Sequence, residues 1–182
     1  MELKIIAAPD HRLRTTATRV SAFDVDEQLL IDGMFVMMEK SNGVGLAAPQ
    51  IGVSKRIIVM DVPKLEAHAD MEPDAEKHGR FEMVNPVITH RDGSMIWNEG
   101  CLSVPGFDDD VKRDRTISVR YQDRYGNEKL LRASGLLAAC IQHEIDHLDG
   151  VLFIDRLSTI RKDIIVRRLK KLKKESLRSN EK

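Results

Sequence analysis

The chain has 182 residues, of which 42% are hydrophobic, and its formal net charge is zero. This composition supports one good hydrophobic core, while the length is short for two domains, so we expect one domain with a tail. The opening apolar run, residues 5–8, is far shorter than a membrane span or a secretory signal, which predicts a soluble cytoplasmic protein. In that compartment Cys101 and Cys140 are expected to be reduced thiols.

Charge is distributed unevenly along the chain. Residues 156–182 hold 11 Lys/Arg against 3 Asp/Glu, a net charge of +8, so the preceding part carries −8. Such asymmetry favours an appendage that binds a polyanion, although a solvated basic helix without a partner has the same composition. We divide the chain into a single domain over residues 1–157 and a basic helical tail over residues 158–182.

The first predicted elements are a surface segment and a helix. Residues 9–20 predict extended or loop structure. Ser21 or Asp24 is suited to cap a helix that runs to about Lys40, and Gly43 to end it in a left-handed conformation. The next segment is Gly43-Val44-Gly45-Leu46-Ala47-Ala48-Pro49-Gln50. Its glycines allow close backbone approach, which favours a substrate-binding wall, and the lysine of a phosphate loop is missing.

The middle of the chain is predicted to be largely antiparallel β structure, and the fold class to be α+β. Residues 64–79 lack a strand or helix period and predict an exposed loop that carries His68 and His78. Pro86, after Asn85, is expected to separate two of the strands. The predicted strands are residues 56–61, 82–84, 87–90, 95–98, 116–122 and 128–132, the last two forming a hairpin.

A predicted helix between Ser134 and Gly150 carries His143-Glu144-Ile145-Asp146-His147. Residues four apart lie on the same helical face, so both imidazoles can bind one metal ion with the Glu144 carboxylate close by. A metal ion and a carboxylate base are the machinery of hydrolysis, and the alternative is two surface histidines on an ordinary helix. The helix is apolar on two sides, which indicates a buried central helix and favours the metal site.

A short strand, residues 151–154, and a last helix from Ser158 to about Leu177 complete the prediction. The helix has many Lys and Arg residues around a narrow apolar stripe. That stripe consists of Ile160, Ile164, Ile165, Leu169 and Leu172.

A catalytic metal site usually has three protein ligands, so one ligand must come from outside the helix. Metzincin proteases would need a histidine at position 153, which is Phe153, and gluzincin proteases would need Glu175 or Glu181 to reach in from the basic tail. Cys101 remains, whereas Cys140, on the histidine face of the helix, is expected to line a pocket beside the metal. A Cys-His-His set suits Zn²⁺, Fe²⁺, Co²⁺ or Ni²⁺.

Three stretches together resemble the signature motifs of peptide deformylases in order and separation. They are residues 43–50, Glu99-Gly100-Cys101-Leu102-Ser103 and Gln142-His143-Glu144-Ile145-Asp146-His147, and the resemblance extends over nearly all of residues 5–157. It implies removal of the formyl group from the N-terminal formyl-methionine of new bacterial or organellar proteins. It also implies one divalent metal ion, with Fe²⁺ as the native metal and Zn²⁺, Ni²⁺ or Co²⁺ as substitutes.

The resemblance assigns roles to individual residues. Cys101, His143 and His147 would bind the metal, which makes hydroxide available near neutral pH, and Glu144 would act as general base and acid. The Leu102 backbone N–H and the Gln50 amide would stabilise the charge that develops on the formyl oxygen.

Substrate contacts are assigned in the same way. Gly45 would form backbone hydrogen bonds with an extended peptide. Glu99 and Arg113 resemble a pair that orients Gln50, whereas the helical wheel places Asp146 away from the metal, outside the catalytic set. Four side chains, together with the hydrocarbon wall near Trp97, would form the methionine slot, and two glycines would support the site. The slot residues are Val44, Leu136, Ala139 and Cys140, and the glycines are Gly43 and Gly100.

The chain departs from the family in two places. Gly106-Phe107-Asp108-Asp109-Asp110 is acidic where many members have a basic or tyrosine-containing stretch, and residues 64–79 are longer than the usual connection. The basic tail resembles that of bacterial members that dock on ribosomal RNA near the peptide exit. Two other functions stay open: a metallopeptidase that cuts internal bonds, and a ribosome- or RNA-associated module whose structural metal would need a fourth ligand.

Overall fold

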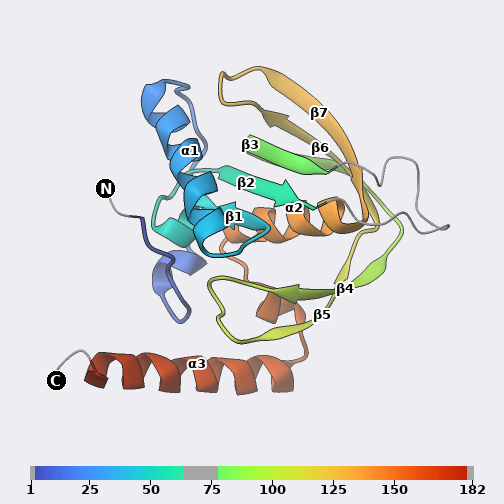
Figure 1. The fold of residues 1–182 in the computed structure, drawn as a ribbon. Coiled ribbons are helices and arrows are strands. Elements are labelled where there is room, and N and C mark those ends of the chain that lie inside the picture. Colours follow the sequence, from blue (N-terminus) through green and yellow to red (C-terminus); the bar gives the residue numbers. More distant parts are fainter. Residues whose placement is uncertain (1–2, 64–77, 180–182) are drawn as a thin grey trace.

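The computed structural model describes residues 3–63 and 78–179, and its fold is α+β, as predicted. A central helix, α2 (Gly135–Leu148), lies between a five-stranded sheet and a two-stranded sheet (Figure 1). All described strand pairs are antiparallel. The five-stranded sheet has the order β1 (Gly45–Ala47), β2 (Ile57–Val62), β3 (Gly79–Asp92), β6 (Thr116–Gln122), β7 (Glu128–Ser134), and the smaller sheet pairs β4 (Met95–Gly100) with β5 (Asp108–Arg113).

Helix α2 is buried on nearly all sides, as its two apolar stripes predict. Leu137, Ile141 and Leu148 pack into the core cluster beneath the five-stranded sheet. The helix begins after Ser134, and Gly150 follows it with φ +74°. A Cβ atom on Gly150 would lie 2.7 Å from the Arg14 carbonyl carbon, so both the turn and the packing require glycine here.

Helix α1 (Val25–Lys40) has Asp24 as its N-cap, and its boundaries match the prediction. The predicted left-handed position at Gly43 is wrong, because Asn42 occupies it with φ +54°. Asparagine tolerates this conformation better than most residues, and Gly43 N–H then donates to the Met38 carbonyl at 2.9 Å.

Strand β3 is one continuous strand, which corrects the prediction of two strands split at Asn85 and Pro86. Its pairing with β6 shifts register between Val84 and Val87, and Asn85 has φ +53°. The Asn85 side chain bonds to the Val20 backbone at 2.8 and 2.9 Å, so this irregularity ties the N-terminal segment to the sheet.

Two further segments differ from the prediction. The acidic residues 108–110 form the start of strand β5, which was not predicted, and residues 151–154 do not form a strand. A 3₁₀ turn, Phe153–Arg156, stands there instead, and another, His11–Arg14, lies within the predicted surface segment. His78 is exposed as expected, whereas His68 and the rest of the predicted loop over residues 64–77 lie outside the described residues.

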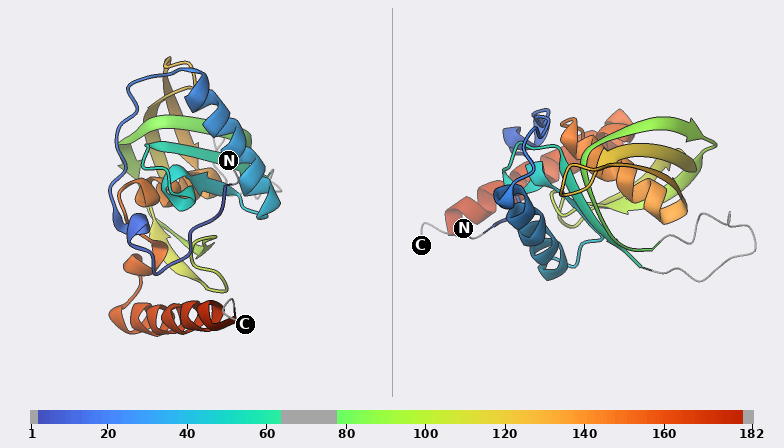
Figure 2. Two further views of the ribbon diagram at one scale, coloured as in Figure 1. Left: turned by 90° about the vertical axis from the view of Figure 1, so that its left-hand side faces the viewer. Right: turned by 90° about the horizontal axis from the view of Figure 1, so that it is seen from above.

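Helix α3 (Thr159–Ser179) runs beside the two-stranded sheet, on the side opposite α2 (Figures 1 and 2). Only part of its predicted apolar stripe is buried: Ile165 and Leu169 pack against the cluster that contains Leu13 and Phe153. Ile160, Ile164 and Leu172 are exposed. Among the described helices none is both long enough and apolar enough to cross a bilayer.

Candidate metal centre

Cys101 and the two histidines converge in space. Cys101 follows the end of β4, whereas His143 and His147 lie one turn apart on α2. The Cys101 Sγ atom lies 3.2 Å from His147 Nε2, which in turn lies 3.2 Å from His143 Nε2. Among the described residues, Cys101, His143 and His147 form the cluster of donor atoms that could hold a metal ion. A thiolate and two imidazoles suit a borderline-soft divalent cation.

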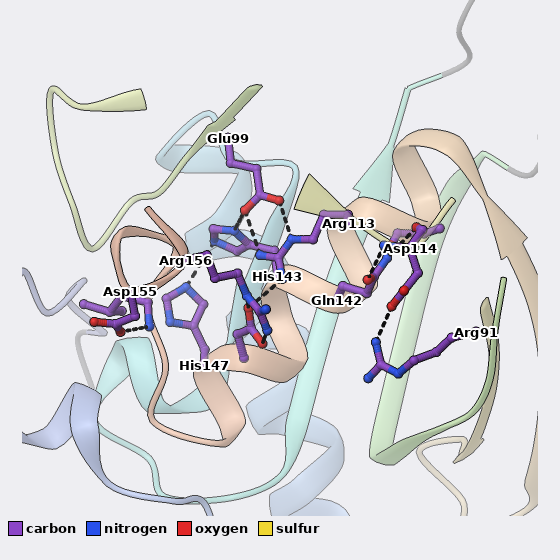
Figure 3. A network of polar contacts seen from close by, with 12 residues as sticks. Arg91, Glu99, Arg113, Asp114, Gln142, His143, His147, Asp155 and Arg156 are labelled. Carbon is purple, nitrogen blue, oxygen red and sulfur yellow. Dashed lines mark hydrogen bonds and ion pairs between the residues drawn. The ribbon is translucent and has the colours of Figure 1, made fainter. Parts of the chain in front are cut away.

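A chain of charged side chains, buried except for Arg156 at its far end, holds His143 in place (Figure 3). Glu99 accepts a hydrogen bond from His143 Nδ1 at 2.8 Å and two from Arg113, at 2.6 and 2.8 Å. Because Nδ1 carries the proton in this contact, the lone pair of Nε2 faces the cluster, as a metal ligand requires. Arg113 also donates to Asp146 at 2.7 Å, and Asp146 accepts from Arg156 at 2.6 Å.

These contacts correct one expectation and add residues that the sequence did not indicate. Glu99 and Arg113 are paired, but Glu99 orients His143 and not Gln50. Asp146 lies away from the metal ligands, as the helical wheel predicts, yet it anchors Arg113. The last partner, Arg156, lies in the 3₁₀ turn before α3. Only its contact with Asp146 in the folded structure shows that it belongs to this network.

The charges around the ligands favour a cation. Burial would raise the pKa of Glu99, but the hydrogen bonds from Arg113 and His143 outweigh it and lower the pKa to about 2. Burial lowers the pKa of His147, and the neighbouring His143 lowers it further, so its lone pair stays available. For His143, burial lowers the pKa, but Cys101 and Glu99 outweigh burial and raise it. The same two groups would stabilise a metal ion that takes the place of the Nε2 proton. The residues present therefore fit a divalent metal ion.

Glu144 lies directly beside the ligands. Its side chain is buried, and its Oε2 atom has no hydrogen-bond partner among the described residues. Burial raises the pKa of Glu144 to about 7, so the group can take up and release a proton near neutrality. A Cβ atom on Gly45 would lie 2.4 Å from Glu144 Oε1. Glycine at this position therefore makes room for the carboxylate.

Gln50 and Leu102 lie close to the same ligands. The Ala47 N–H donates to Gln50 Oε1 at 2.8 Å, which turns the Gln50 amide nitrogen toward Ser103 Oγ at 3.2 Å and Cys101 Sγ at 3.7 Å. Ser103 is a further residue that the sequence did not single out. Leu102 follows Cys101 directly and lines the cavity described next.

A cavity of about 640 Å³ opens onto this site. The predicted methionine slot is brought together on its wall, beside Trp97 and the glycines at positions 43, 45 and 100. Burial raises the pKa of Cys140, so this thiol stays neutral and contributes apolar surface. The slot residues that line the cavity are Val44, Leu136, Ala139 and Cys140.

Residues 2–163 match the family model of polypeptide deformylases, which covers most of the chain. The chain belongs to the polypeptide deformylase family. The peptide deformylase of Xylella fastidiosa (strain M12) is 46% identical over 172 residues, which are 93% of this chain and 95% of that protein. The peptide deformylase of Helicobacter hepaticus is 41% identical over 174 residues, or 96% and 93% of the two chains.

Solved deformylase structures have the same fold. The crystal structure of the peptide deformylase from Ehrlichia chaffeensis has a TM-score of 0.87 at 40% identity and covers 94% of this chain and 96% of its own. Its complex with actinonin has a TM-score of 0.86 at the same identity, covering 93% and 96%. The resemblance drawn from the three motifs is confirmed, and the protein is a metal-dependent hydrolase that removes the N-formyl group from new polypeptides.

Proposed function

We propose that this deformylase acts on the N-terminal formyl-methionine of newly made chains through one divalent ion bound by Cys101, His143 and His147. The observation that supports this most directly is the convergence of these three donors beside a buried Glu144 atom without a described partner. When bound, the ion lowers the pKa of a water molecule toward neutrality and attracts the electrons of the formyl oxygen. Fe²⁺ is the native ion in this proposal, and Zn²⁺, Ni²⁺ or Co²⁺ are substitutes that the donor set also suits.

Glu144 is the proton carrier. Its carboxylate takes a proton from the attacking water as the new C–O bond forms at the formyl carbon. It then gives that proton to the departing nitrogen as the C–N bond breaks, so that formate and a free amine leave. A pKa near 7 suits both transfers, because neither form of the group is strongly favoured at neutral pH.

Gln50 and Leu102 stabilise the oxygen that gains charge during this step. The Ala47 N–H holds Gln50 Oε1, so the side chain presents its N–H₂ group, a donor, toward the ligand cluster. The Leu102 backbone N–H is the second donor. Preorganised donors of this kind commonly contribute a factor of about 10² to 10³ to the rate each.

The substrate backbone binds at the outer edge of β1, where Gly45 supplies hydrogen-bonding groups. Strand β1 pairs with β2 on one side and stands at the end of the five-stranded order. An added strand is the common way to bind an extended peptide at such an edge. The methionine side chain then enters the slot formed by Val44, Leu136, Ala139 and Cys140.

The test of the proton carrier is Glu144→Gln. This variant keeps the three metal ligands, so its metal content should equal that of the wild type, while formate release from formyl-Met-Ala-Ser should fall about 10²- to 10⁴-fold. Glu128→Gln, on the exposed part of β7, is the control and should keep full activity. Retained activity in Glu144→Gln would reject this base, and cleavage of an unformylated peptide by the wild type would favour a metallopeptidase.

We propose that residues 1–157 form the catalytic domain and that the basic tail, residues 158–182, which contains α3, docks on ribosomal RNA. The surface of α3 that faces away from Ile165 and Leu169 carries exposed Lys170 and Lys174, and lysine rows favour phosphate contacts. We place the enzyme in the cytoplasm, where formylated chains are made.

The docking proposal is tested by salt-dependent co-sedimentation with ribosomes. Replacing Lys170 and Lys174 by Glu should weaken co-sedimentation and reduce its salt dependence, because both phosphate contacts are reversed. Replacing Lys40 and Lys112, which are exposed on the catalytic domain, changes the net charge equally and should have little effect. Equal behaviour of the two double variants would reject docking through α3.

A further inference from the structure

The cavity above the metal ligands has one exposed charge on its rim. Its charged lining residues are Glu99, Glu144 and Asp108, and the part of the chain that the structure describes places no Lys or Arg on its wall. Glu99 is held by Arg113 and His143, and Glu144 is buried beside the metal ligands. Asp108 is exposed, so it is the one of these three carboxylates that stays accessible to a molecule entering the cavity.

The geometry of β5 explains why Asp108 differs from its two acidic neighbours. Side chains alternate along a strand, so Asp109 points to the other face, where Arg161 of α3 donates to it at 2.8 Å. Asp110 accepts a hydrogen bond from Asn98 at 3.2 Å. Within residues 3–63 and 78–179, Asp108 has neither a hydrogen bond nor an ion pair from its side chain.

The surroundings of Asp108 leave room for a ligand group. Its register partner on β4 is Gly100, which has no side chain to cover it. Gly106, two residues earlier, has nothing within 4 Å of where its Cβ would be. Gly43, Val44 and Gly45, which precede or begin the edge strand β1, also line this cavity.

We propose that Asp108 makes this enzyme favour new polypeptides with Lys or Arg at the second or third residue. This inference rests on the proposed function, because it takes the substrate to run from the metal ligands along β1 toward the cavity mouth. The side chains that follow the methionine then pass the unpaired carboxylate of Asp108. A cationic side chain gains an ion pair there, whereas an acidic one is repelled.

The experiment measures kcat/KM for formate release from formyl-Met peptides that carry Lys, Gln or Glu at position 2, and from a second set varied at position 3. For the metal-loaded wild type, we expect the Lys peptide to exceed the Glu peptide about three- to tenfold at one position at least, as suits an exposed ion pair. This ratio should fall toward one in about 0.5 M salt, because screening shortens the range of the interaction.

Single substitutions in β5 test whether Asp108 causes the Lys-to-Glu ratio of kcat/KM. Asp108→Asn should bring the Lys-to-Glu ratio close to one, and Asp108→Lys should invert it. Asp110→Asn removes the same charge from the same strand face, outside the cavity lining, and should keep the wild-type ratio. Because each ratio compares two substrates on one enzyme preparation, partial loss of metal or folding cancels.

The inference is overturned if the wild type shows no preference, or if the preference persists in Asp108→Asn. Failure of the wild type to release formate from the neutral Gln peptide would be a different result. It would contradict the proposed reaction itself, and with it the substrate path on which this preference depends.

Discussion

Arg113 is predicted to be the most costly residue to remove from the charge network beside the metal ligands. Its side chain is 2% exposed, and its partners Glu99 and Asp146 are 5% and 11% exposed. In Arg113→Ala, Glu99 keeps only the contact with His143, and Asp146 keeps only Arg156. Removing one partner of a buried ion pair costs about 3–5 kcal/mol. At about 2–4 °C per kcal/mol for a chain of this size, Tm should fall by about 6–20 °C.

The assay is thermal and urea unfolding at a fixed free metal concentration, with Arg156→Ala as the comparison. Arg156 is 41% exposed, so its loss should cost about 1 kcal/mol or less. Arg113→Ala should also bind the metal about 10- to 100-fold more weakly in competition with a chelator, because Glu99 no longer holds His143 firmly. A loss below about 1 kcal/mol, or equal losses in the two variants, would refute this account of the network.

Three further predictions follow from the site and its surroundings. Gly45→Ala should keep the bound metal but lose about 10²-fold in kcat, because the new methyl group displaces Glu144. Formate release and metal analysis test this, with Gly33→Ala in α1 as a control that should keep full activity. A chelator should abolish formate release, and adding Fe²⁺, Zn²⁺, Ni²⁺ or Co²⁺ should restore it; activity that survives complete removal of the metal would contradict the assigned centre. Burial raises the pKa of Asp155, but hydrogen bonds from Arg14 and Lys162 outweigh burial and lower the pKa below its ordinary value of 3.8. The stability that this carboxylate contributes is therefore present above that value and decreases as pH falls. In urea unfolding, Asp155→Asn should be less stable than the wild type at pH 7, and the difference should narrow below about pH 4.

Local periodicity predicted the parts of the fold that depend on neighbouring residues. The spacing of His143 and His147, and the apolar stripes on both sides of them, predicted a buried α2 between Ser134 and Gly150. The burial follows from the 3.6-residue period, and Gly150 marks the C-terminal end of the helix. Ser134 occupies the N-cap position, although its side chain makes no capping hydrogen bond.

Features that depend on distant partners were not predictable in this way. Strand β5 begins with three aspartates, which have low strand propensity, and it forms because β4 pairs with it and Val111 and Arg113 become buried. Of the α3 stripe only Ile165 and Leu169 became buried, since the cluster beneath the helix covers little more than its middle.

The site, like the fold, was predictable from sequence only in part. The donors Cys101, His143 and His147 could be named before the structure, because their residue types carry the chemistry of metal binding. Arg156 could not be named, because its role depends on a 3₁₀ turn that brings it to Asp146. The catalytic roles of Glu144 and Gln50 stay predictions that the variants above test.

The ligand donors come from two different layers of the molecule. Cys101 follows a strand of the two-stranded sheet, whereas both histidines belong to a helix packed on the five-stranded sheet. An ion bound by all three is therefore a crosslink between layers, and the hairpin of β4 and β5 cannot separate from α2 without breaking a bond to it. Amide hydrogen exchange in β4 and β5 should accordingly slow when the ion binds, and the residence time of the ion should report how often this hairpin opens.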